Sequence, residues 1–147
     1  MDALYVATAT ATGGRVGRAV SCDGNLAVDL VVPQEMGGSG DPGTNPEQLF
    51  AAGYSACFLS ALTLVAGKRG VDASLATVTA DVGLLREGRG FKLEVALRVA
   101  MPGVEADQAR ELVETAHQVC PYSNATRGNI EVGLEVQEPA ATSGGAA

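Results

Sequence analysis

The sequence contains no tryptophan, and aromatic residues make up only 4% of its 147 residues. The core must therefore be built mainly from Ala, Val and Leu, and a hydrophobic content of 46% excludes a disordered chain. The single histidine means that a metal site of Cys and His ligands would need an unusual ligand set. The length fits one domain with a sizeable core.

Positive charge is scarce: 10 Lys and Arg stand against 17 Asp and Glu, which gives a net charge of −7. Such a surface repels phosphate backbones and anionic lipid, so we expect no nucleic-acid partner. Met1–Leu4 have no basic region before an apolar run, so no secretory signal is expected. Three cysteines, an odd count without such a signal, favour reduced or redox-active thiols over a disulfide framework.

An uncharged run from Leu49 to Gly67 is long enough for a transmembrane helix. Its richness in Ala, Gly, Ser and Thr, and the lack of a second such run, argue against a membrane span. A central helix of a small globular protein, buried on all sides, explains the run better. We therefore expect no membrane association.

The hydrophobic periodicity predicts an α+β domain, because the elements do not alternate as in a doubly wound fold. The predicted strands cover residues 4–12, 15–22, 26–32, 74–85, 91–100 and 130–136, and the predicted helices cover 46–68 and 105–119. The first three strands form an antiparallel meander, and strands 74–85 and 91–100 form a long hairpin. Residues 122–129 are predicted to be a loop, and residues 139–147 a disordered tail.

Helix boundaries are signalled by capping residues and prolines. Thr44 with Glu47, or Asn45 with Gln48, has the spacing of a capping box, and Pro46 suits the first turn of a helix. In the second helix an apolar stripe is predicted to consist of Ala109, Leu112, Val113, Ala116, Val119 and Cys120. The proline after Cys120 ends this helix.

Two cysteines, Cys57 and Cys120, lie on the two apolar helices. Either one alone would be read as a small core residue. Helices that must pack together in a small domain could, however, bring the two within disulfide range. A free thiol is only about 3% ionised at pH 7, and burial lowers this fraction further, so a reactive cysteine needs a nearby cation.

Arg15 and Arg127 are candidates for that cation, and Glu47 is a natural partner for such an arginine. The alternative is that both arginines are solvated surface charges and that Glu47 favours the first helical turn only through capping and the helix dipole. His117 lies three residues before Cys120, so a Cys–His hydrolase pair is a further alternative. Cys22, beside a predicted turn, is expected to be a spare thiol.

Three segments resemble the organic hydroperoxide resistance proteins of the OsmC-like superfamily. The segment Asn45–Phe58 resembles their first signature, His117–Asn129 the second, and Thr10–Arg15 the third. The likeness extends over about residues 4–137. It implies a single OsmC-like domain over residues 1–138, with antiparallel sheets packed around two central helices in an intertwined homodimer.

The resemblance also implies roles for named residues. Cys57 matches the peroxidatic cysteine and Cys120 the resolving cysteine that closes a disulfide with it. Arg15 matches the arginine that stabilises the thiolate, and Glu47 the carboxylate that orients this arginine. The family is cytoplasmic, uses no metal, haem or flavin, reduces alkyl and fatty-acid hydroperoxides, and is itself reduced by dihydrolipoyl groups on proteins.

Phe50 and Phe58 could form an apolar wall for the alkyl chain of a peroxide. Glu47 and Cys57 lie ten residues apart, about 15 Å along an unbroken helix. Either the helix breaks near Gly53, or Arg15 and Glu47 reach Cys57 from the partner subunit, and we favour the second arrangement. A redox sensor or lipid-binding protein that uses the same apolar surface without turnover is the competing function. A relative within the superfamily with another peroxide preference is a third.

Overall fold

The computed structural model describes residues 1–137. The chain divides into two compact units, one over Met1–Leu49 and one that begins at Phe50. A single domain over residues 1–138 therefore remains a prediction. The predicted disordered tail, residues 139–147, lies outside the described residues.

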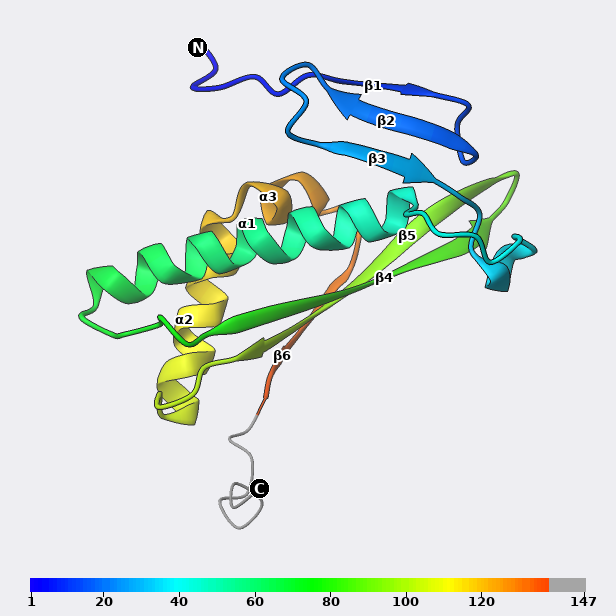
Figure 1. Cartoon of the computed structure of the whole chain (residues 1–147). Coiled ribbons are helices and arrows are strands. Elements are labelled where there is room, and N and C mark those ends of the chain that lie inside the picture. Colours follow the sequence, from blue (N-terminus) through cyan, green and yellow to red (C-terminus); the bar gives the residue numbers. More distant parts are fainter. Residues whose placement is uncertain (138–147) are drawn as a thin grey trace, which may run out of the picture. The chain divides into compact units, whose positions relative to one another are not determined.

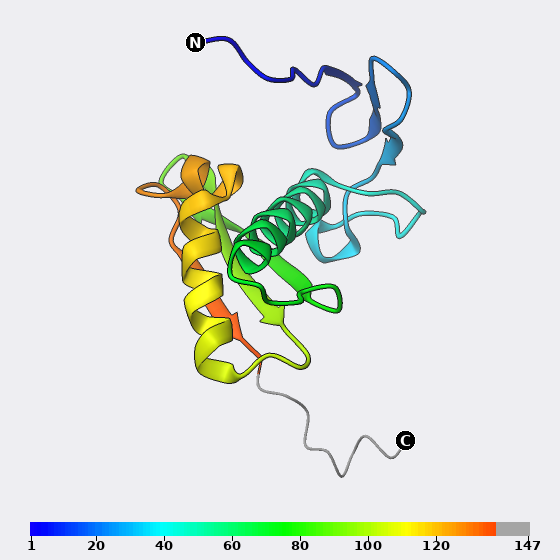
Figure 2. The ribbon, with the colours of Figure 1, turned by 90° about the vertical axis from the view of Figure 1, so that its left-hand side faces the viewer.

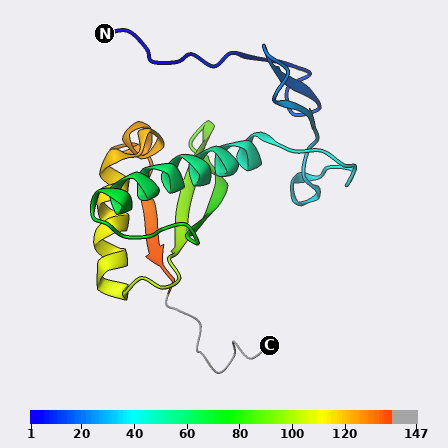
Figure 3. The same ribbon diagram turned by 60° about the vertical axis from the view of Figure 1, so that its left-hand side comes forward.

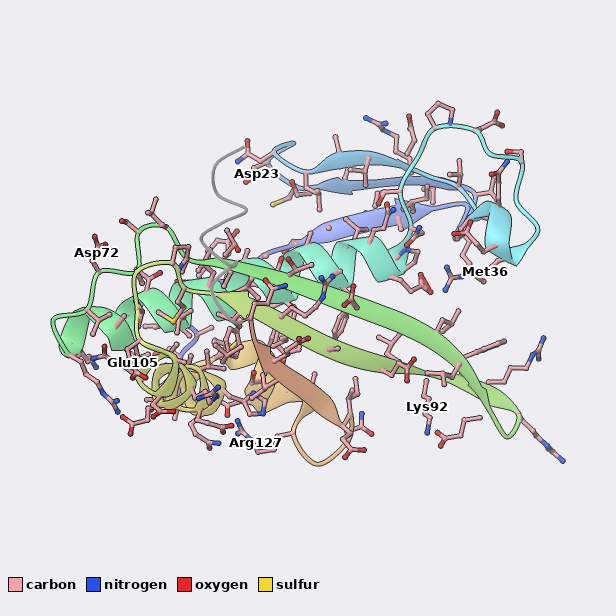
Figure 4. The ribbon with its side chains drawn as sticks, turned by 90° about the horizontal axis from the view of Figure 1, so that it is seen from below. Asp23, Met36, Asp72, Lys92, Glu105 and Arg127 are labelled. Carbon is pink, nitrogen blue, oxygen red and sulfur yellow. The ribbon has the colours of Figure 1, made fainter. Side chains whose placement is uncertain are left out.

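The first unit contains a three-stranded antiparallel sheet, shown in blue in Figure 1. Its strands are β1 (Ala9–Thr12), β2 (Gly17–Ser21) and β3 (Ala27–Leu30), so the predicted meander is confirmed. The first strand is shorter than predicted, because its ladder with β2 ends at the Ala9–Ser21 pair. The chain then turns at Asp23, labelled in Figure 4, whose carboxylate accepts a hydrogen bond from the Asn25 backbone N–H at 3.0 Å.

The second unit contains a sheet of β4 (Thr77–Glu87), β5 (Gly90–Ala100) and β6 (Val132–Val136), in that order. The predicted hairpin is confirmed, since β4 and β5 pair in antiparallel register along their full length. The antiparallel sheets that the resemblance implies are found except at the last pair, where β6 runs parallel to β5. The reason is the connection: a helical crossover returns the chain to the same end of the sheet before β6 begins.

The helices are η1 (Gln34–Met36), α1 (Pro46–Lys68), α2 (Ala106–Val119) and α3 (Pro121–Thr126). The two predicted helices are confirmed. Residues 122–129, predicted to be a loop, instead begin within α3, because Pro121 ends α2 and also occupies the first turn of a new helix. Figures 2 and 3 show the part of α1 after Phe50 and α2 on the same face of the β4–β5–β6 sheet.

The core of the second unit lies between these helices and the sheet. Val95, Leu97 and Val99 of β5 face it, and each is at most 4% exposed. Phe91, at the hairpin end of the same strand, is 62% exposed. The predicted stripe of α2 is buried except for Val119, which is exposed.

Helix α1 is long and apolar enough to cross a membrane by length and composition, and a third of its most apolar window is buried. Its buried residues follow helical spacing along one face: Tyr54, Phe58, Ala61, Leu62, Val65 and Ala66. The expectation of a helix buried on all sides is therefore wrong for the single chain. Leu64, on the opposite face, is 52% exposed.

Candidate active site

The sulfur atoms of Cys57 and Cys120 lie 3.6 Å apart, with the Cys120 thiol donating to Cys57 Sγ. Both are free thiols; Cys57 is half-buried and Cys120 is fully buried. Cys57 lies in α1, whereas Cys120 lies at the junction of α2 and α3. Packing of α1 against this junction brings the two sulfurs together. A disulfide could close here after a small movement, since bonded sulfurs lie about 2.05 Å apart.

The backbone at Cys120 holds its side chain at the junction between two helices. Its N–H donates to the Ala116 carbonyl at 2.8 Å, and its carbonyl accepts from the Asn124 N–H at 2.9 Å. The residue itself is extended, with φ −62° and ψ 124°, as expected before a proline. The sequence Cys120-Pro121 therefore both ends α2 and caps α3.

Local contacts oppose ionisation of Cys57 more than they favour it. Burial raises the pKa of the Cys57 thiol, and the Cys120 thiol acts in the same direction. A hydrogen bond from the backbone N–H of Tyr122 has the opposite effect and lowers the pKa. Within its own unit, Cys57 thus remains a thiol at neutral pH, and thiolate chemistry requires a cation from elsewhere.

Arg15 and Glu47 form a bidentate ion pair in the first unit. Arg15 Nη1 donates to Glu47 Oε2 at 3.0 Å, and Nη2 donates to Oε1 at 2.5 Å. The Glu47 side chain is only 14% exposed and that of Arg15 is 36% exposed. The hydrogen bonds from Arg15 lower the pKa of Glu47, so the carboxylate is ionised and holds the guanidinium in one orientation.

A tight turn presents Arg15. Gly13 and Gly14 have φ of 77° and 61°, a region that favours glycine. A Cβ on Gly13 would lie 2.2 Å from the Val16 carbonyl oxygen, so a larger residue would force this turn open. The arginine follows directly after these two glycines, at the end of β1.

The start of α1 presents Glu47. Asn45 is the capping residue, because its side chain accepts the Gln48 backbone N–H at 2.8 Å. The Thr44 side chain instead donates to the Gln48 side chain at 2.7 Å. Of the two predicted capping boxes, the Asn45–Gln48 pair therefore provides the cap, through the Asn45 side chain. Thr44 is also bonded through its backbone to Asp29 and Val31, which ties the helix start to β3. Glu47 is thereby left to bind Arg15.

An aromatic cluster lies near the sulfur pair in the second unit. Phe50, Tyr54 and Tyr122 have ring centroids 5.6–6.2 Å apart. Phe50 is half-buried and remains a candidate substrate contact. Phe58, the other predicted wall residue, is fully buried in the core and packs beside His117, so it offers no surface to a substrate.

The other predicted candidates have different partners. The Nδ1 atom of His117 lies 2.8 Å from Ser123 Oγ, and the bonding partner of Cys120 is Cys57, so the Cys–His hydrolase pair is not formed. Arg127, labelled in Figure 4, donates to the Asn124 side chain and to the His117 carbonyl at the end of α3. Cys22 is an exposed free thiol. Among residues 1–137, no group of three or more His, Cys, Asp or Glu side chains could hold a metal ion.

Sequence reasoning missed three polar residues beside the cysteines, namely Tyr54, Ser123 and Thr126. They are almost fully buried and hydrogen-bonded to one another. Tyr54 has the helical spacing of the buried apolar residues of α1, so its position in the sequence does not distinguish it from a core residue. The only available signal was that tyrosine and serine in a buried position must find hydrogen-bond partners.

Known proteins share both the sequence and the fold. The family model described as OsmC-like protein matches residues 38–135. The chain is 53% identical over 132 residues to an organic hydroperoxide resistance protein of Xanthomonas axonopodis pv. citri, covering 89% of this chain and 93% of the relative. The chain belongs to the OsmC-like family. Within this OsmC-like family it is one of the organic hydroperoxide resistance proteins, as its three segments predicted.

Further relatives of this OsmC-like protein agree. It is 49% identical over 138 residues to the organic hydroperoxide resistance protein OhrA of Bacillus subtilis, covering 92% of this chain and 97% of OhrA. A crystal structure of such a protein from Elizabethkingia anophelis has a TM-score of 0.89 at 52% identity, covering 95% of this chain and all of that one. One from Vibrio cholerae, with captopril in one of its active sites, has a TM-score of 0.89 at 50% identity and covers 96% and 97% of the two chains.

Proposed function

We propose that this protein is a thiol peroxidase that reduces organic hydroperoxides to alcohols and so contributes to organic hydroperoxide resistance. The observation that carries the proposal is the approach of the Cys57 and Cys120 sulfurs to 3.6 Å, one half-buried and one buried. The names of its relatives, organic hydroperoxide resistance proteins, supply the substrate class.

The first chemical step is attack of the Cys57 thiolate on the outer oxygen of the hydroperoxide. The O–O bond breaks, Cys57 becomes a sulfenic acid, and the leaving alkoxide takes a proton to become the alcohol. In the second step, the Cys120 sulfur attacks the Cys57 sulfur. The S–S bond forms, the S–O bond breaks, and the hydroxyl group leaves with the Cys120 proton as water.

Arg15 is the proposed cation for the first step. A guanidinium beside Cys57 would offset the burial that raises the pKa of this thiol, and it would also stabilise charge on the departing oxygen. Glu47, through its two hydrogen bonds, would hold the guanidinium ready. Arg127 is the weaker candidate, since its guanidinium donates to the Asn124 side chain in α3 and to the His117 carbonyl in α2.

The protein is proposed to act as a homodimer whose site combines two subunits. Helix α1 runs without interruption from Pro46 to Lys68, so the alternative of a break near Gly53 is wrong. Arg15 and Glu47 of one subunit would then serve Cys57 of the other. Exposed apolar side chains support a dimer: Leu4, Val6, Val16 and Leu64 are all more than half exposed in the single chain.

Mixed dimers test the shared site. One chain carries Cys57→Ser and the other Arg15→Ala, and each variant is inactive as a homodimer. A shared site predicts that the mixed dimer regains one good site, about half the wild-type activity of two. A site within one chain predicts no recovery, because each chain would contain one defect in its own site.

The remaining parts of the proposal concern substrate, reductant and location. Phe50 and the neighbouring, partly exposed Tyr122 ring would contact the alkyl chain, which favours organic peroxides over hydrogen peroxide. The disulfide is proposed to be reduced by dihydrolipoyl groups on a partner protein, in the cytoplasm. The cycle needs no metal or organic cofactor, because the two cysteines supply the electrons.

A thiol count tests the function directly. The reduced protein has three free thiols, and one equivalent of tert-butyl hydroperoxide should leave one, that of Cys22. Loss of one thiol or none would contradict the two-cysteine cycle. Repeated turnover with dihydrolipoamide separates an enzyme from a redox sensor or lipid-binding protein, which would stop after one oxidation.

A further inference from the structure

A buried chain of polar side chains joins three helices behind the sulfur pair. His117 Nδ1 lies 2.8 Å from Ser123 Oγ, and Ser123 Oγ lies 2.8 Å from Tyr54 Oη. Tyr54 Oη lies 3.3 Å from Thr126 Oγ1, which donates to the Ser123 carbonyl at 3.2 Å. Tyr54 and Ser123 are fully buried and Thr126 is 3% exposed, so water does not compete for these groups.

The number of protons sets the direction of the chain, because each hydroxyl has one proton to donate. The Thr126 hydroxyl gives its proton to the Ser123 carbonyl, so Tyr54 must donate to Thr126. Ser123 must then donate to Tyr54. The last bond can form only if the His117 Nδ1 carries a hydrogen and donates it to Ser123.

The three helices that meet here are those that hold the cysteines. Tyr54 lies in α1 three residues before Cys57, and His117 lies in α2 three residues before Cys120. Ser123 lies in α3, the short helix that Cys120 caps. The same turn of α3 directs the Tyr122 backbone N–H at the Cys57 sulfur. Bonds from both sides to Ser123 therefore fix the turn that carries Cys120 and Tyr122.

We propose that His117, Ser123 and Tyr54 are positioning residues for closure of the Cys57–Cys120 disulfide. This inference rests on the proposed function, and it concerns the second step of that cycle alone. In this step a bond forms between the sulfurs of Cys120 and Cys57, and the S–O bond of the Cys57 sulfenic acid breaks. The departing hydroxyl group takes the Cys120 thiol proton and leaves as water. The sulfurs must approach from 3.6 Å, so the orientation of the α3 turn sets how often a productive approach occurs.

Tyr54→Phe removes one hydroxyl from the chain, and Tyr5→Phe, at an exposed tyrosine, is the matched control. Each protein is mixed with one equivalent of tert-butyl hydroperoxide, and peroxide consumption and thiol loss are followed separately. We expect Tyr54→Phe to consume peroxide at the wild-type rate but to close the disulfide about five- to tenfold more slowly, as for one lost buried hydrogen bond. Its sulfenic acid should then accumulate and be trapped by dimedone, whereas Tyr5→Phe behaves as wild type.

Two outcomes would overturn the inference: an unchanged closure rate in folded Tyr54→Phe, or an equal slowing of both steps. If the wild-type protein itself consumes no peroxide or closes no disulfide, the proposed function fails instead. The two failures are thus distinguishable by the wild-type traces.

A second pair of variants does not depend on the folding of Tyr54→Phe. His117→Asn retains an N–H that can donate to Ser123, whereas the similarly shaped His117→Asp carries only acceptors when ionised. We expect closure close to wild type in His117→Asn and at least fivefold slower in His117→Asp. Equal closure rates in the two variants, or an Nε2–H tautomer of neutral His117 in ¹⁵N NMR spectra of the wild type, would contradict the donor direction.

Discussion

At the residue scale, Cys57 shows how position changes the chemistry of a common side chain. Burial alone makes its thiol less acidic, and the neighbouring Cys120 thiol adds to this effect. Only the Tyr122 N–H acts in the other direction. A cysteine so placed stays protonated at neutral pH unless a cation lies beside it.

Glu47→Gln tests the proposed orientation of Arg15. The amide keeps the shape of the carboxylate but loses its charge, so Arg15 is held less firmly. We expect peroxide consumption to fall by about tenfold or more, with disulfide closure unchanged. Glu35→Gln, at an exposed residue of η1, is the control; similar rates in the two variants would contradict a role for Glu47.

The Arg15–Glu47 pair also predicts that the free energy of unfolding depends on pH. Hydrogen bonds from Arg15 lower the pKa of Glu47 in the folded state, so the unfolded chain takes up a proton first as pH falls. The stabilisation is therefore complete above the ordinary pKa of about 4.3 and is lost below it. Because Arg15 is partly exposed, we expect at most about 1 kcal/mol, measured as the difference in urea unfolding between wild type and Glu47→Gln at pH 7 and pH 3.

The burial of His117 predicts a second pH dependence of stability, at higher pH than that of Glu47. Burial lowers its pKa, and the charge of Arg127 acts in the same direction while that of Glu114 opposes it. The unfolded chain therefore binds the proton first, and wild type loses stability as pH falls below about 6.5. Thermal melts at pH 8 and pH 5 should show a larger loss in wild type than in His117→Asn. Equal losses would show that His117 titrates with its ordinary pKa.

At the scale of elements, different parts of helix α1 carry different candidate site residues. Its first turn, capped by Asn45, presents Glu47, whereas its middle presents Tyr54 and Cys57 to the second unit. Gly53 lies between them and allows the Tyr122 ring to approach, since a Cβ there would lie 2.6 Å from Tyr122 Oη. A helix-weakening residue is thus explained by a contact with α3.

Gly53→Ala and Gly67→Ala form a matched pair on the same helix. Alanine favours a helix over glycine by about 1 kcal/mol, and a Cβ on Gly67 would meet nothing within 4 Å. We therefore expect Gly67→Ala to raise the free energy of unfolding. In Gly53→Ala this gain should be offset by displacement of the Tyr122 ring. Urea unfolding measures both, and an equal gain in the two variants would contradict the proposed contact.

At the scale of the whole molecule, the exposed apolar side chains predict self-association. Sedimentation equilibrium should give twice the chain mass of 14.9 kDa, about 30 kDa. A charge in the exposed face of α1, as in Leu64→Glu, should weaken the dimer, whereas Asn129→Glu, at an exposed residue beyond α3, should not. A wild-type mass of one chain would contradict both the dimer and the shared site.

Local signals predicted most elements of the fold. Asn45, Pro46 and Gln48 predicted the start of α1, and alternation predicted the β4–β5 hairpin, because both patterns depend on neighbours within a few residues. The missed elements were those in which one local signal has two readings. Pro121 can end a helix or begin one, and it does both. The direction of β6 depended on the crossover before it, which periodicity does not report.

The sequence by itself determined which residues are candidates for the chemistry: two cysteines on apolar helices, and an arginine after a glycine turn with a glutamate in a first helical turn. Tertiary structure alone decided the 3.6 Å between the sulfurs and the hydroxyl chain from His117 to Thr126. Tyr54 and Ser123 bond across 69 positions of sequence, and no periodicity links residues so far apart. Such contacts form only when separate helices pack, since packing selects partners by shape and by the need of buried polar groups for hydrogen bonds.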